Sequence, residues 1–443
     1  MALLTVTAAI FRFSTLGVQH YWIDESVTVA LLRLSFGGML HTIPLTESTP
    51  PLYYVIAWVW TKLFGTSELG LRSLSALAGT AAVPVCYAAA AQFASRRVAL
   101  FTTALAAVSP MLVWYSQEAR AYSLLMLLSA LTVLFFGEAL RDPKRSTIGL
   151  WSVASVLALA THYFAGFLVL GEAIWLLAQR RARGRVALAC VPIVTAVGAL
   201  APLAEYQHRQ GHLTFIGTTA LASRIRNTAE VFVAGQTGPL IPGVTAAGLV
   251  LVGVAVALLV VCASRPERRR LLPTAAVGAC GLGVPLVLAV AGWDYVLARN
   301  LLPVWLPIAI LVACGFAVPV AGRFRIGAGI ALCLYSTAIC VAVPLTAGLR
   351  RESITAQLLH LHNSDAVVGI TYVTVPGGEQ RTGFVQCPSG YASTQGYVSW
   401  LPGSGGHLRV APGSRPGTWN ARGAANGSGT AVYQLTVVCA RTP

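Results

Sequence analysis

The sequence has few charged residues for its length and almost no lysine. Only 10% of the 443 residues are Asp, Glu, Lys or Arg, whereas soluble domains carry about 25%. This scarcity argues against a soluble enzyme, a disordered chain and a collagen-like chain. The chain is instead 56% hydrophobic, and apolar stretches of about 20 residues recur along it. These stretches predict a polytopic helical membrane protein.

Basic residues concentrate in short linkers between the apolar stretches. The net charge of +16 comes mainly from arginine, because the only lysines are Lys62 and Lys144. Arg and Lys make up 15 of the 22 linker residues. In the segments that join the opposite ends of the apolar stretches (20–72, 118–120, 162, 205–242 and 293–299), they make up only 8 of 102 residues. The positive-inside rule therefore makes the linkers cytoplasmic. We expect membrane lipids, and no nucleic acid, as partners. The linkers are residues 96–97, 141–145, 180–185, 265–270 and 323–325.

This placement predicts about eleven transmembrane helices, with the N-terminus cytoplasmic and the C-terminus outside. Residues 52–64 are also apolar, but thirteen residues are short for a bilayer. Counting them as a span would move the basic linkers outside. We expect this run and the segment from Ser26 to Thr42 to form in-plane helices in the first outer loop, residues 20–72. The predicted spans lie near 2–19, 73–95, 98–117, 121–140, 146–161, 163–179, 186–204, 243–264, 271–292, 300–322 and 326–348.

The composition changes after residue 349, where the transmembrane domain (1–349) is predicted to end. Strand-like runs at 366–375 and 431–439, separated by Gly, Ser and Pro, predict a small α/β or β-rich outer domain over 350–443. Seven of the nine cysteines lie in apolar spans, where cysteine acts as a small hydrophobe. The other two, Cys387 and Cys439, predict a disulfide in an oxidising compartment. The sequence has no CxxC or HExxH motif for a metal.

Acidic residues are rare enough to consider one by one. Asp24 and Glu25 directly follow the first predicted span, where they either cap a helix or supply a general base at the membrane surface. Glu118 and Arg120 lie between two spans with almost no loop, as a structural ion pair or as functional groups. Glu172, inside a predicted span, is expected to make a buried polar contact.

Two further arginines and a histidine stand at the outer ends of predicted spans. Arg72 and Arg299 either extend toward lipid headgroups or bind phosphate through the planar guanidinium group. His162 occupies an outer tip as a base, a metal ligand or a hydrogen-bonded turn residue. Carboxylates and arginines on one face would suit a reaction in which a hydroxyl displaces the phosphate of a lipid carrier.

Six short motifs resemble those of a known family, the polyprenyl-phosphate-sugar-dependent glycosyltransferases of the GT-C fold. Among these the chain is most similar to family 39 and the lipid A aminoarabinose transferase-like membrane proteins of bacteria, which include protein O-mannosyltransferase-like members. The motifs run in order over roughly residues 1–320. They are WIDE (22–25), TPPLYY (49–54), LRSLSAL (71–77), SQEARAY (116–122), THY (161–163) and RNLLP (299–303).

The resemblance implies a role for each matching position. The residues implied to be catalytic are Asp24, the base that activates the acceptor, Glu25 beside it, and Glu118 at the second acidic position. Relatives often have Tyr where this chain has Asn300. The positions implied to bind substrate are Glu47, Tyr53, Tyr54, Arg72, Arg120, Tyr122, His162, Tyr163 and Arg299.

The resemblance therefore implies an inverting membrane glycosyltransferase at the outer face of a bacterial plasma membrane. Its donor would be a polyprenyl-phosphate sugar, with mannose or a pentose as candidates, and its acceptor a protein, lipid or glycan hydroxyl of the cell envelope. No cofactor is implied with certainty, and a divalent metal stays open because relatives differ. Three alternatives remain: a transporter or flippase of lipid-linked sugars, a membrane scaffold, and a lipid-diphosphate-oligosaccharide-dependent transferase of the same fold.

Overall fold

The computed structural model describes residues 1–19, 21–209, 216, 219–317, 322–346, 366–387, 391–400, 406–412, 418–425 and 431–441. Two compact units can be distinguished within the chain. A helical unit comprises residues 1–19 and 48–350, and a second unit comprises residues 20–47 and 351–443. The predicted boundary at 349/350 falls outside the described residues.

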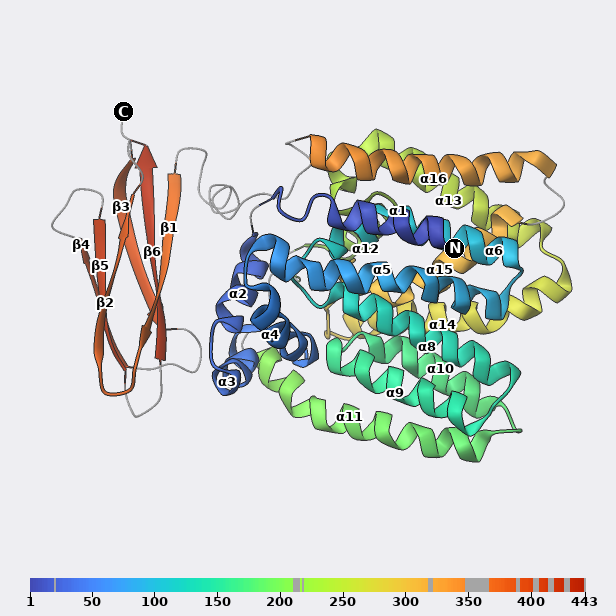
Figure 1. Cartoon of the computed structure of the whole chain (residues 1–443), viewed down its shortest axis with the longest axis horizontal. Helices are drawn as coiled ribbons and strands as arrows, with labels where there is room; N and C mark the ends of the chain where they lie inside the picture. The colour runs from blue at the N-terminus through green and yellow to red at the C-terminus, as the bar shows by residue number, and fades with distance from the viewer. Residues whose placement is uncertain are drawn as a thin grey trace. The chain divides into compact units, whose positions relative to one another are not determined.

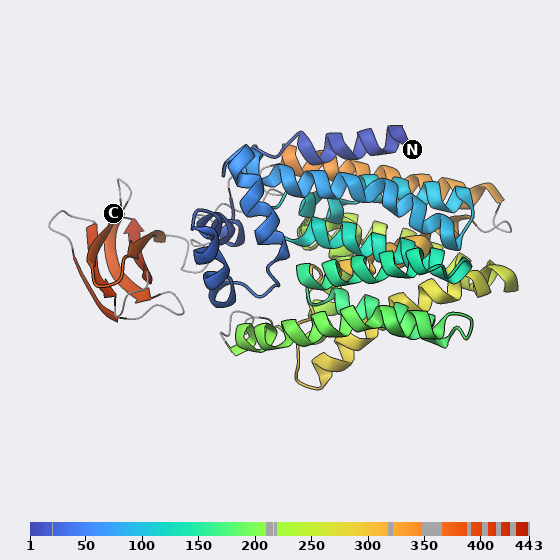
Figure 2. The same ribbon diagram turned by 60° about the horizontal axis from the view of Figure 1, so that its bottom comes forward.

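The helical unit is a bundle of apolar helices that run side by side. Helix α5 packs against α8, α8 against α9, α10 against α14, and α13 against α15, and the helices stay aligned in both views (Figures 1 and 2). The helices are α1 (Ala2–Phe13), α4 (Leu52–Phe64), α5 (Glu68–Phe93), α6 (Arg96–Val108), α7 (Pro110–Ser116), α8 (Tyr122–Arg141), α9 (Arg145–Thr161), α10 (Ala165–Ala178), α11 (Arg183–Arg209), α12 (Leu221–Ala234), α13 (Pro242–Cys262), α14 (Arg265–Val290), α15 (Trp305–Ala317) and α16 (Gly322–Leu345).

Several of these helices can cross a membrane by length and composition. Among the described residues, α5, α8, α11, α13, α14 and the part of α16 from Phe324 to Leu345 meet that test. Helices α6 and α7 make a further span if they are taken as one helix bent by 51°. The prediction of a polytopic, mainly helical membrane protein is confirmed, while the number eleven stays a prediction.

Helix α6 ends where the sequence places Ser109 before Pro110. Proline has no backbone N–H and disfavours a helical conformation in the residue before it. Ser109 adopts an extended backbone, and its side chain accepts a hydrogen bond from the backbone N–H of Leu112. A new helix, α7, therefore begins at Pro110 in a different direction.

The second unit contains two short helices and two small antiparallel sheets. The segment predicted as one in-plane helix forms α2 (Ile23–Leu32) and α3 (Phe36–Thr46). The chain breaks between them because the Ser35 side chain caps α3 by accepting from the N–H of Gly38. The sheets have the orders β1-β6-β3 and β2-β5-β4, which confirms the β-rich form of the predicted C-terminal domain. The strands are β1 (Ala366–Val375), β2 (Gln380–Gln386), β3 (Tyr391–Trp400), β4 (Gly406–Pro412), β5 (Thr418–Ala425) and β6 (Ala431–Arg441).

Candidate active site

Three of the acidic candidates, Asp24, Glu25 and Glu47, belong to the second unit. Asp24 and Glu25 lie in the first turn of α2. The Glu25 carboxylate is buried and accepts a hydrogen bond of 3.4 Å from the backbone N–H of Trp22, so Glu25 caps its own helix. Asp24 is half-buried at the same helix start, where the helix dipole favours a carboxylate. Glu47 is buried at the C-terminal end of α3.

In the helical unit, the tight turn between α7 and α8 carries the SQEARAY motif. Glu118 is 2% exposed, and its Oε1 accepts a hydrogen bond of 2.9 Å from the indole N–H of Trp114. Arg120 and Tyr122 are buried as well. The ring of Tyr122 lies 4.8 Å from that of Tyr115 and 6.3 Å from that of His162. The turn therefore brings this motif beside the tip between α9 and α10.

His162 ends α9 and lies under the influence of two arginines. Burial, together with the positive charges of Arg299 and Arg120, lowers the pKa of His162 to about 3. Its Nδ1 accepts a hydrogen bond of 3.2 Å from the backbone N–H of Phe164. Nδ1 must therefore be unprotonated, which leaves the proton of the neutral ring on Nε2. The charges of Arg120 and Arg299 therefore both act on a neutral His162 whose Nε2 carries the proton.

Two chains of hydrogen bonds connect the tyrosines of the TPPLYY motif to other elements. The Tyr53 hydroxyl lies 3.4 Å from Ser75 Oγ on α5, and Ser75 Oγ donates to the carbonyl of Arg120. These contacts join the motif to the turn that carries Arg120.

The second chain of bonds begins at Tyr54, whose hydroxyl lies 3.4 Å from Thr49 Oγ1. Gln207 on α11 donates to the carbonyl of Thr49 and accepts from the hydroxyl of Tyr163 at 2.8 Å. Sequence reasoning missed Gln207, because a single glutamine just after a predicted span (186–204) carries no motif.

Arg72 makes a different contact from the one that its position suggested. Its guanidinium group, 1% exposed, donates to the carbonyls of Leu16 and Gln19 at 2.8 and 2.6 Å. These carbonyls follow the end of α1. Arg72 therefore ties α5 to the segment after α1, and a role in binding phosphate stays a prediction.

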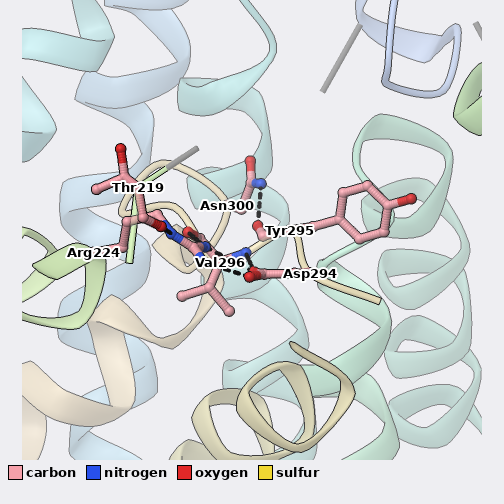
Figure 3. A network of polar contacts seen from close by, with 6 residues as sticks. All are labelled: Thr219, Arg224, Asp294, Tyr295, Val296 and Asn300. Atoms are coloured by element: carbon pink, nitrogen blue, oxygen red, sulfur yellow. Dashed lines mark hydrogen bonds and ion pairs between the residues drawn. The ribbon is translucent and has the colours of Figure 1, made fainter. Parts of the chain in front are cut away.

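Arg299 lies in a loop, residues 291–301. The side chains of Arg224 and Asn300 hold this loop in shape (Figure 3). Arg224 on α12 forms a two-pronged ion pair with Asp294 and donates to the carbonyl of Val296 at 3.0 Å. The amide of Asn300 donates to the carbonyl of Tyr295 at 2.8 Å. Hydrogen bonds from Arg224 hold the pKa of the Asp294 carboxyl below its usual value. Asn300, which departs from the motif of relatives, thus closes the loop that presents Arg299.

Glu172 has the structural role expected of it. Its carboxylate on α10 accepts hydrogen bonds from Thr132 on α8 and Trp151 on α9 at 3.1 and 2.9 Å. Among the residues that the structure describes, no three His, Cys, Asp or Glu side chains come together in a group that would hold a metal. Cys387 is disulfide-bonded. The side chain of Cys439 lies outside the described residues, so this pairing stays a prediction.

Comparison with known proteins gives a family match and several similar folds. Residues 48–205, just over a third of the chain, match the family of dolichyl-phosphate-mannose-protein mannosyltransferases. A search of curated proteins gives no match to this chain.

Two proteins of known structure share the arrangement of helices. The structure of ArnT from Cupriavidus metallidurans bound to undecaprenyl phosphate has a TM-score of 0.54 and 16% identity over 81% of this chain and 67% of ArnT. The oligosaccharyltransferase of Archaeoglobus fulgidus in its apo form has a TM-score of 0.50 and 12% identity over 79% of this chain and 56% of its own. The same archaeal enzyme tethered to an acceptor peptide gives a TM-score of 0.50 at 11% identity over 79% of this chain and 55% of its own. These likenesses establish the fold and confirm the fold predicted from the motifs.

Proposed function

We propose that this chain, which has the fold of the GT-C membrane glycosyltransferases, transfers a monosaccharide from a polyprenyl-phosphate donor to an acceptor hydroxyl. The family matched by residues 48–205 is named for a lipid-phosphate sugar donor. The similar structure of ArnT contains undecaprenyl phosphate. Both support a lipid-linked donor for this chain, and the family name favours mannose among the candidate sugars.

One observation carries the proposal: the positive charges of Arg120 and Arg299 both lower the pKa of His162. Two guanidinium groups beside a buried, neutral ring create a positive potential in surroundings of low polarity. Such a place attracts a phosphate and stabilises the negative charge that develops on it as the sugar departs. Neutral His162 adds an Nε2–H donor that carries no charge of its own.

In the proposed reaction, a carboxylate removes the proton of the acceptor hydroxyl. Asp24 is the proposed base, because its WIDE motif (22–25) resembles that of relatives in which this acid activates the acceptor. The acceptor oxygen attacks the anomeric carbon of the sugar and forms the new glycosidic bond. The bond from that carbon to the phosphate oxygen breaks on the opposite side, so the configuration inverts. Polyprenyl phosphate leaves with its charge held by Arg120 and Arg299, while Glu118 orients the sugar.

The proposal includes an orientation in the membrane. The basic linkers are cytoplasmic, which places the turn with Glu118 and the tip with His162 on the outer side. The N-terminus is then cytoplasmic, and the C-terminal β domain is extracytoplasmic, where a disulfide at Cys387 is stable.

A second candidate is a transferase that uses a lipid-diphosphate oligosaccharide. The likeness to the archaeal oligosaccharyltransferase favours it. The two candidates share the fold and the cationic site, and they differ in the donor that the site accepts.

Sugar transfer in membranes distinguishes these possibilities. Membranes that contain the wild type or Asp24→Asn are supplied with a panel of radiolabelled polyprenyl-phosphate sugars and a lipid-diphosphate oligosaccharide. We expect the wild type to consume one monophosphate donor and Asp24→Asn, at equal folded level, to lose at least about 100-fold of that rate. Asp142→Asn, the same change in a cytoplasmic linker, should keep full activity.

Each other outcome contradicts a definite part of the proposal. Consumption of the lipid-diphosphate donor alone supports the second candidate. Equal activity of wild type and Asp24→Asn removes Asp24 as the base. Failure of the wild type to consume any donor favours the transporter or scaffold hypotheses.

A further inference from the structure

A charged side chain that the proposed reaction does not use is buried in the apolar interior of the helical unit. Arg12 on α1 is 1% exposed, and its guanidinium group donates four hydrogen bonds. One goes back to the carbonyl of Ala8 on α1, and the others go to α6 and α7. A charge at such a place in a membrane protein is costly and marks a specific role.

Two of these bonds are made to the end of α6. Arg12 donates to the carbonyls of Ala106 and Ala107 at 2.9 and 3.0 Å. In a continuous helix the carbonyl of Ala106 would accept from residue 110, but Pro110 has no N–H. The guanidinium group supplies donors to carbonyls at the 51° bend, where a broken helix leaves them without helical partners.

The remaining bond reaches beyond the bend to the SQEARAY motif. Arg12 Nε donates to Ser116 Oγ at 3.1 Å. The next residue, Gln117, donates from its amide to the carbonyl of Phe11 and to Thr15 Oγ1, at 2.8 and 2.6 Å. The last turn of α1 and Thr15, just after it, therefore hold the two residues that directly precede Glu118.

Helix α5 leaves space for this contact at Gly79. A Cβ atom added there would lie 2.1 Å from Ser116 Oγ and 3.1 Å from Arg12 Nε. No side chain other than hydrogen fits at this position unless Ser116 moves. The packing of α5 and the hydrogen bonds of α1 thus specify the same position for Ser116.

We infer that Arg12 is a positioning residue that fixes the bend between α6 and α7 and thereby places Glu118 and Arg120 for the reaction. The catalytic part of this inference rests on the proposed function, because it assigns Arg12 an effect on sugar transfer through Glu118. The structural part stands on the hydrogen bonds and the space at Gly79 alone. Arg12 itself touches neither sugar nor phosphate in this role.

Two measurements on the full-length protein in nanodiscs test the inference, with Arg12→Met as the variant. The matched control is Arg268→Met, because Arg268 also donates to carbonyls at the end of a helix, those of Val260 and Ala263. Hydrogen–deuterium exchange should increase over residues 109–121 in Arg12→Met and stay at the wild-type level there in Arg268→Met. Exchange over α8 to α10 should be unchanged in both.

Kinetics then separate positioning from general destabilisation. We expect Arg12→Met to lower kcat about 100-fold, and Arg12→Lys, which keeps a charge but makes fewer bonds, to recover part of it. In a Glu118→Gln background, the further loss from Arg12→Met should be less than about threefold, because residues that act as one unit are not additive. An equal loss in both backgrounds contradicts positioning through Glu118.

The failure of the inference can be told from failure of the proposed function. If wild type consumes no donor, the proposed function fails, and exchange over residues 109–121 still decides whether Arg12 fixes the bend. If exchange in Arg12→Met rises everywhere or nowhere, the inference is wrong. Should Arg12→Met not fold, Ser116→Ala removes one of the same bonds and should raise exchange over the same segment.

Discussion

His162 is a residue at which burial and two neighbouring charges act in the same direction. Its pKa in the folded protein is about 3, below the ordinary value of 6.5. As the pH falls below 6.5, the unfolded chain takes up a proton that the folded chain refuses until about pH 3. The folded state is therefore most stable above pH 6.5 and loses stability as the pH decreases.

We expect His162→Gln to reduce this dependence on pH. The wild type should lose on the order of a few kcal/mol of unfolding free energy between pH 7 and pH 4 through this group. In His162→Gln that part of the loss should be absent, so its Tm should fall less. The check is Tm in nanodiscs across that range, with exposed His41→Gln as the control. An equal slope in wild type and His162→Gln would contradict the neutral, buried state of His162.

A second residue-scale prediction concerns Arg299. Removal of its charge in Arg299→Gln should raise the pKa of His162, although burial should still hold it below 6.5. The same change should raise the KM for the lipid-phosphate donor about 10- to 100-fold, the size of a lost charged hydrogen bond. Histidine NMR titration and initial rates measure the two effects. Arg226→Gln, an exposed arginine on α12, should change neither, and a normal KM in Arg299→Gln would remove Arg299 from the phosphate site.

Sequence patterns located the arginines of this unit but did not give the partners of all of them. The motifs singled out Arg120 and Arg299, and the charges of both arginines act on His162, whereas their role in binding phosphate stays a prediction. The role of Arg12 was missed because two of its acceptors are the backbone carbonyls of Ala106 and Ala107, and a sequence pattern does not reveal backbone acceptors. The contacts of Arg72 were missed for the same reason, because they too are made to backbone carbonyls. Contacts with backbone atoms depend on where a helix breaks, which is known only in three dimensions.

At the scale of elements, the fit between α5 and α7 depends on a single glycine. We expect Gly79→Ala to destabilise the protein by about 1–3 kcal/mol, because the new methyl group overlaps Ser116. Activity should fall as well, since Ser116 is two residues from Glu118. Gly149→Ala on α9 is the matched control, because a Cβ there meets nothing within 4 Å, and alanine is the better helix former. Equal Tm values for Gly79→Ala and wild type would show that Ser116 can move freely.

The loop that carries Arg299 depends on a pair of residues 70 positions apart in the chain. Arg224→Gln should release Asp294 and loosen residues 291–301. We expect this variant to raise the KM for the lipid-phosphate donor, but less than Arg299→Gln does. Amide hydrogen exchange in the loop should also increase. Asp294→Asn should act alike, and the double variant should be little worse than either single change. Fully additive losses would mean that the two residues act separately.

At the scale of the whole molecule, hydropathy and charge were enough to predict the class of fold. Each predicted span contains a helix, because apolar runs between basic linkers have few alternatives in a bilayer. The in-plane segment from Ser26 to Thr42 proved to be two helices, since capping by Ser35 is a weaker signal than hydropathy. The strand pairing β1-β6-β3 joins the two ends of the C-terminal domain, and turn-rich sequence between strands does not specify such an order.

The orientation that we propose from the distribution of charge gives the last prediction. Alkaline phosphatase folds only where disulfides form, so a fusion after Pro443 should be active and a fusion within the linker 265–270 inactive. The same compartment should keep Cys387 blocked to maleimide until a reductant is added, and Cys439→Ser should expose it without reductant. The reverse pattern of fusion activity would place the His162 tip and the basic linkers on the opposite sides. In that case the donor would have to be bound from the cytoplasm, and a site that relies on an outer acceptor would be excluded.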